Sequence, residues 1–178
     1  MKLNYLAGFL AANLFRFLRV FPNSDPIMGF VVPCAKNEKV WKAPLFAFSS
    51  MFIFDFFTSG IGIWTIVTAT AYAFVAMLLG SWLRGKASSI KGFLSAGALG
   101  VLVFDFITGP IMSTFLFKQE FIATLAMQVP FTAMHIISAS FFVLLISPLY
   151  DPAIAREMSG YFSVAKTAAK SAVKVLGF

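Results

Sequence analysis

The stretch IGIWTIVTATAYAFVAMLLGSWL, residues 61–83, contains no charged side chain. An α-helix needs about 20 mostly apolar residues to cross the hydrocarbon core of a bilayer, and this stretch is long enough. Trp82 lies at its end and Arg84, Lys86 and Lys91 follow, which is typical of a membrane boundary. The sequence therefore predicts a membrane-spanning helix here.

The composition of the whole chain supports the same class. Of 178 residues, 60% are hydrophobic and 12% are charged, and the mean hydropathy is +0.87. A soluble domain of this size does not need so many apolar residues to fill its core. Because no segments alternate as the strands of a membrane barrel do, we expect an all-α membrane protein.

Further apolar segments predict a bundle of about six transmembrane helices in residues 1–150. They are 3–20, 27–35, 43–57, 90–107 and 121–146. The segment 27–35 is short for a crossing and contains Pro33, so we expect a short or re-entrant helix there. Pro130 predicts a kink in the last segment.

The basic residues predict the orientation of this bundle. If segment 27–35 crosses the bilayer, 11 of the 14 Lys and Arg residues lie on the side of both termini. By the positive-inside rule, that side is cytoplasmic, in a multi-pass protein of the plasma membrane. The other face would then carry the connections 22–26, 57–62 and 109–120.

Two aspartates occur in similar apolar words, FDFFTSGI at 54–61 and FDFITGPI at 104–111. An acid inside an apolar segment is costly, so it usually faces a cavity or a partner. We expect Asp55 and Asp105 to end helices and to open turns on the outer face, where they form a cup for a small molecule. The predicted ligand-binding residues are Asn23, Asp25, Asp55, Thr58, Trp64, Thr65, Asp105 and Thr108, with help from Tyr72.

Several other functions are disfavoured by the sequence. The single cysteine, Cys34, and the single histidine, His135, do not form a metal-ligand pattern, and we interpret His135 as a hydrogen-bonding residue between helices. No phosphate-binding loop or hydrolase motif occurs, so we expect no catalytic residue, metal or cofactor. The net charge of +7 is explained by the span ends, which favours anionic lipid over nucleic acid as a partner.

Residues 151–178 predict a separate C-terminal element. Lys166, Lys170 and Lys174 fall on one helical arc, opposite alanines and valines. This pattern is typical of an amphipathic helix that lies in the membrane interface. A basic tail without that role is the alternative.

The chain resembles the substrate-binding S components of energy-coupling factor (ECF) transporters. The similar features are the small residues of the first span, the short second segment, and the words that begin at Asp55 and Asp105. The resemblance implies a membrane-embedded binding subunit for uptake of a vitamin or similar micronutrient, powered by a separate transmembrane coupling subunit and ATPases. It also implies that Ala7 and Ala11 contact the coupling subunit.

Two alternatives remain open from the sequence. A non-catalytic scaffold subunit of a larger membrane complex would also use small residues on its first span and an amphipathic tail. An intramembrane aspartyl protease would use two aspartates, but the usual Gly-x-Gly-Asp context is absent.

Overall fold

The computed structural model describes residues 2–18 and 24–176, with side chains for 5–18 and 24–167. All elements within these ranges are helical, which confirms the predicted all-α class. Their bounds are α1 Lys2–Leu18, α2 Pro26–Asn37, α3 Lys42–Phe57, α4 Ile63–Leu83, α5 Ile90–Phe106, η1 Ile107–Ile111, α6 Met112–Phe117, α7 Phe121–Tyr150 and α8 Pro152–Leu176.

Three helical stretches are long and apolar enough to cross a membrane. They are Ile63–Leu83, Ile90–Phe117 and Phe121–Tyr150. Many of their large apolar side chains point outward, as expected where lipid replaces water as the solvent. The helix α1 contributes a shorter apolar stretch, Tyr5–Leu18.

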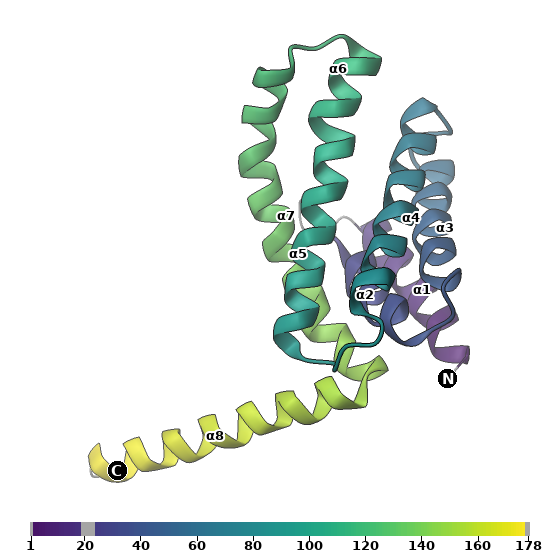
Figure 1. The fold of residues 1–178 in the computed structure, drawn as a ribbon. Helices are drawn as coiled ribbons and strands as arrows, with labels where there is room; N and C mark the ends of the chain where they lie inside the picture. Colours follow the sequence, from purple (N-terminus) through teal and green to yellow (C-terminus); the bar gives the residue numbers. More distant parts are fainter. Residues whose placement is uncertain (1, 19–23, 177–178) are drawn as a thin grey trace.

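The short helix α2 lies among the other helices (Figure 1). It contacts α1, α3, α4, α5 and α7, and its residues from Pro26 to Ala35 are buried. Pro26 opens the helix, and the Asp25 side chain accepts a hydrogen bond from the Met28 backbone N–H as an N-cap. Gly29 lets α7 approach closely, because a Cβ there would lie 2.7 Å from the Phe142 carbonyl oxygen.

The two expected Asp/Thr/Gly turns differ. After Asp55 the chain does turn, and Gly60 has a φ of 76°. After Asp105 the expected turn is wrong, because the helix continues through the π-helical η1 and α6 and ends at Lys118, which has a φ of 57°. Pro110 lacks an N–H, but backbone groups in an apolar medium must stay paired, so the helix widens there without ending.

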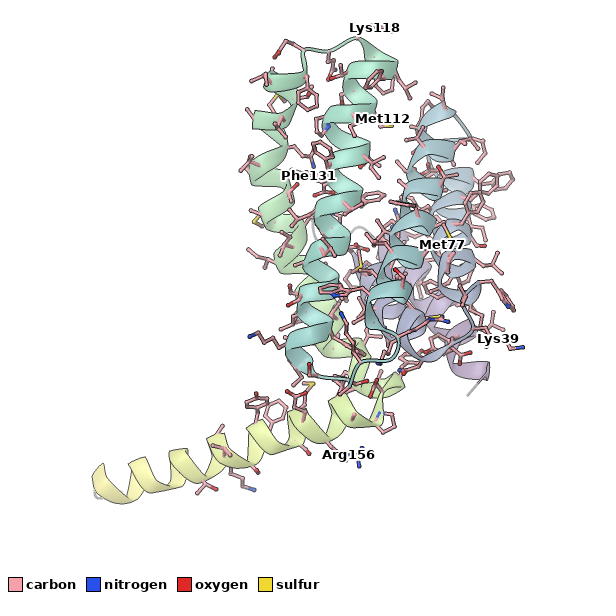
Figure 2. The ribbon with its side chains drawn as sticks, in the orientation of Figure 1. Lys39, Met77, Met112, Lys118, Phe131 and Arg156 are labelled. Atoms are coloured by element: carbon pink, nitrogen blue, oxygen red, sulfur yellow. The ribbon has the colours of Figure 1, made fainter. Side chains whose placement is uncertain are left out.

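The connections separate to the two ends of the bundle (Figures 1 and 2). Lys118 lies at the end where α3 joins α4 and α6 joins α7, whereas Lys39 and Arg156 lie at the opposite end. The helix α8 starts at this second end, runs across the direction of the bundle helices, and contacts α7 and α5.

Candidate functional site

Three polar side chains meet inside the bundle and form what we call the Asp–His–Asp cluster: Asp25, Asp105 and His135. They come from the N-cap of α2, the last turn of α5 and the middle of α7. All three are buried, with exposed fractions of 5%, 1% and 7%. Buried ionisable groups in an apolar protein are costly unless they are paired, so this arrangement points to a function or to a fixed structural junction.

The imidazole of His135 bridges the two carboxylates. Its Nδ1 lies 2.8 Å from Oδ1 of Asp105, and its Nε2 lies 3.0 Å from Oδ2 of Asp25. A neutral imidazole has one N–H donor, whereas an imidazolium has two. If both contacts are hydrogen bonds, either the ring carries two protons or one of the carboxyls is protonated. Both assignments give the cluster a net charge of −1.

Further hydrogen bonds reach both carboxylates. The Tyr72 hydroxyl from α4 donates to Oδ2 of Asp25, and the Thr132 hydroxyl donates to Oδ2 of Asp105 at 2.7 Å. The Gln128 amide in turn donates to the Thr132 hydroxyl at 3.3 Å. A polar chain therefore runs from α7 through the cluster to α4.

A cavity of about 160 Å³ borders this cluster. Its walls combine charged, hydroxyl, aromatic and apolar groups. They include Arg16 of α1, Asp25 before α2, Met51 of α3, Tyr72 of α4, Phe104 of α5, and Phe131 and His135 of α7. Figure 2 labels Phe131 in this region of α7. A mostly apolar cavity with a few convergent polar groups is the usual form of a ligand site.

Arg16 supplies a cation to the cavity. Its guanidinium lies 4.1 Å from the centre of the Phe54 ring and donates to the Ser50 carbonyl oxygen over 3.5 Å. It interacts electrostatically with the carboxylates of Asp25 and Asp55. Its positive charge is opposite in sign to the net charge of the Asp–His–Asp cluster, and both groups line the same cavity.

The predicted ligand-binding aspartates are distributed as follows. Asp25 and Asp105 meet through His135, as described above. Asp55 is buried near the end of α3, one turn after Met51, which lines the cavity. Its backbone carbonyl accepts from Thr58, Ser59 and Gly60, and no side-chain hydrogen bond to Asp55 occurs among the described residues.

The predicted threonines make local hydrogen bonds. Thr58 and Thr108 donate to the carbonyls of Phe54 and Phe104, each four residues earlier. Thr65 is fully buried and accepts from the Gly62 N–H at the start of α4.

The remaining predicted site residues lie at the periphery. Trp64 is 39% exposed at the start of α4, and Ala7 and Ala11 are on the exposed side of α1. Asn23 lies outside the residues that the structure describes.

Sequence reasoning missed Arg16 and the central position of His135 in the site. The contacts of His135 agree with its predicted role as a hydrogen-bonding residue between helices. The available signals were a single histidine and an arginine, each inside an apolar segment, because ionisable residues within membrane segments usually face partners. In the part of the chain with described side chains, no three His, Cys, Asp or Glu residues are grouped so that they could hold a metal ion.

Comparisons of the chain with models of protein families, with curated proteins and with solved structures found no match.

Proposed function

We propose that the chain is the membrane-embedded binding subunit of an uptake system for a small micronutrient, working with a separate coupling subunit and ATPases. The main supporting observation is the cavity beside the Asp–His–Asp cluster, which brings Arg16, Tyr72 and aromatic side chains together between apolar helices. Its volume of about 160 Å³ is below the roughly 300 Å³ of typical ligand sites. A vitamin-sized solute therefore requires the cavity to widen.

The charges around the cavity favour a particular class of solute. The cluster carries −1 and Arg16 carries +1, and Asp55 is a further buried acidic side chain, one turn after Met51 of the cavity wall. An anionic solute would add an unbalanced negative charge in a medium of low polarity, which is costly. The sum favours a neutral or singly cationic solute, oriented by the polar groups and stacked against Phe104 or Phe131.

We propose a topology of six crossings with both termini in the cytoplasm, counting α2 as the short second crossing. The ends of the bundle support this orientation, since Lys39 and Arg156 lie opposite Lys118 (Figure 2). The turn after Asp55 would then face outward. A solute would approach the cavity from the extracytoplasmic side.

The outer face of α1 is the proposed contact with the coupling subunit. Ala7 and Ala11 are exposed there, and the neighbouring Leu10 and Leu14 are 62% and 61% exposed. Small residues let a partner helix approach closely in a membrane. This face equally favours a second candidate function, a scaffold subunit that assembles without binding a solute.

Metabolite analysis of the purified chain separates these functions. The full-length protein would be extracted in mild detergent, and co-purifying small molecules would be identified by mass spectrometry. We expect Met51→Phe, which adds bulk to the cavity wall, to abolish the bound metabolite. Met77→Phe is the matched control, because Met77 is half exposed on α4 and outside the cavity (Figure 2).

Absence of any metabolite from the folded wild-type chain, with retention of a partner membrane protein, would support the scaffold function. Equal metabolite content in the two variants would overturn the assignment of the cavity. Thermal melting of each variant shows whether its fold is intact.

A further inference from the structure

A second and larger hollow lies at the end of the bundle that carries Lys39, away from the Asp–His–Asp cluster. Its volume is about 670 Å³, and its walls are Tyr5, Leu6 and Phe9 of α1, Cys34 of α2, and Leu45 and Phe46 of α3. Leu6 and Leu45 are 59% and 54% exposed. The groove between α1 and α3 therefore opens outward through apolar side chains, toward the region that lipid tails occupy in a bilayer.

Charged and aromatic side chains border one end of this hollow. Lys39, Trp41 and Lys42 all line it, and Trp41 is 57% exposed. Lys42 pairs with Glu38, whereas Lys39 is exposed and forms no ion pair within the described ranges. Tryptophan and lysine at such a boundary are typical of contact with lipid headgroups, and this edge carries a net positive charge.

One wall residue contains a polar group that forms no hydrogen bond with any residue whose side chain the structure describes. The hydroxyl of Tyr5 is buried and forms no hydrogen bond among the described residues. Because its accessible surface is almost zero, this hydroxyl does not reach a ligand in the hollow, so recognition rests on the apolar groove and on the lysines that border it. Phospholipids carry ester and phosphate oxygens directly beside their acyl chains.

We propose that this hollow is a binding site for one anionic phospholipid. An acyl chain lies between α1 and α3 against Phe9, Leu45 and Phe46. The phosphate lies at Lys39 and Lys42, beside Trp41. The site does not depend on solute binding at the Asp–His–Asp cluster.

Fluorescence quenching by brominated lipids tests this site. Trp64→Phe and Trp82→Phe leave Trp41 as the single tryptophan of the full-length chain. The protein is placed in mixed phosphatidylglycerol and phosphatidylcholine vesicles in which only one of the two lipids carries bromine. We expect brominated phosphatidylglycerol to quench Trp41 more strongly than brominated phosphatidylcholine at equal mole fraction.

A charge-matched pair of double variants identifies the residues responsible. Lys39→Gln with Lys42→Gln should reduce the preference for phosphatidylglycerol about five- to thirtyfold, the ratio that corresponds to about 1 to 2 kcal/mol for two lysines. Lys91→Gln with Arg156→Gln removes the same charge elsewhere and should keep the preference. Excess glycerol phosphate should not change the quenching, because it lacks the acyl chain.

Other outcomes would overturn the site. Equal quenching by the two lipids in the parent protein excludes selective binding, and equal loss in both double variants indicates general surface charge. Weak quenching by both brominated lipids indicates that a second copy or another protein covers the hollow. Displacement by glycerol phosphate indicates a site for free phosphate compounds.

Discussion

The Nε2 atom of His135 lies 3.0 Å from Oδ2 of Asp25, a residue 110 positions earlier in the chain. Through this contact the middle of α7 holds the start of the short helix α2. The same ring reaches Asp105 of α5 through its other nitrogen. The packing of α2 among its neighbours and the chemistry of the cavity therefore depend on one side chain.

Replacing His135 should destabilise the bundle strongly. His135→Phe leaves Asp25 and Asp105 without their shared partner, and breaking a buried ion pair typically costs about 3 to 5 kcal/mol. Adding Asp105→Asn should restore part of this loss, because one uncompensated charge is removed. The free energy of unfolding can be measured by titration with a denaturing detergent in micelles. Met127→Leu, at an exposed position of α7, is the control and should change it by at most about 0.5 kcal/mol. An unchanged loss in the double variant would contradict the pairing.

Replacing a glycine by alanine should have opposite effects at a closely packed and at an open helical position. Gly29→Ala places a methyl group against the Phe142 backbone and should cost about 1 to 3 kcal/mol, as overpacked cores do. Gly160→Ala on α8 meets no atom within 4 Å and should stabilise that helix by about 0.5 to 1 kcal/mol. Melting temperatures of the two variants should shift in opposite directions. An unchanged melting temperature for Gly29→Ala would show that α2 and α7 are less closely packed at this position.

Asp151 predicts a dependence of stability on pH. Burial acts to raise the pKa of this carboxyl, but hydrogen bonds from Ser88, Asn37 and the N–H groups of Ala153 and Ile154 outweigh burial and lower the pKa below its usual value. A lowered folded pKa stabilises the protein above the unfolded pKa of about 3.9, and this contribution disappears as the pH falls through the folded pKa.

Asp151→Asn tests that dependence. The variant should be less stable than the parent at neutral pH by about 0.5 to 1.5 kcal/mol, because Asn caps a helix as well as Asp does but its uncharged oxygen accepts weaker hydrogen bonds. The difference should begin to shrink below about pH 3.9, where the unfolded chain takes up the proton, and should disappear as the pH falls through the lower folded pKa. Thermal melts of both proteins across this range measure the effect. A difference that persists unchanged at low pH would show that charge is not its source.

Cysteine labelling checks the proposed orientation. In a Cys34→Ala background, Ser59→Cys and Lys118→Cys should react with an impermeant maleimide added outside intact cells. Lys39→Cys should react only after the membrane is opened, since positive charge marks the cytoplasmic side. The reverse pattern would place the cavity entrance toward the cytoplasm.

The lysines of α8 should hold the tail at an anionic surface. Replacing Lys166, Lys170 and Lys174 by Glu removes about 1 kcal/mol of attraction per lysine and adds repulsion. An environment-sensitive dye at Ser171→Cys, in the Cys34→Ala background, should report loss of contact with anionic nanodiscs. Replacement of the same lysines by Arg should preserve contact. If the Glu variant stays bound, charge does not position the tail.

The helices could be predicted from the sequence because their lengths follow from uninterrupted apolar runs. The predicted segment 61–83 is α4, Ile63–Leu83, and the segment 27–35 lies within α2, Pro26–Asn37. The continuation past Asp105 was missed, because Pro110 and Gly109 are also turn residues and a π-helical widening has no distinct signature.

The site was only partly predictable for a different reason. Apolar surroundings identify Asp105 as unusual, but no local pattern relates it to His135 on α7 or to Asp25 before α2. These contacts join residues 27 or more positions apart, and they form only when the helices pack. An acid in an apolar run therefore indicates that a partner exists without identifying it.

The chain contains one histidine, and both nitrogens of that ring face carboxylates. Nitrogen-15 incorporated only into histidine would consequently give a single pair of ring signals in a magnetic resonance spectrum. Their chemical shifts and one-bond couplings to hydrogen would locate the shared proton directly. The molecule thus contains its own spectroscopic reporter at the centre of the bundle, free of overlap and without any added label group.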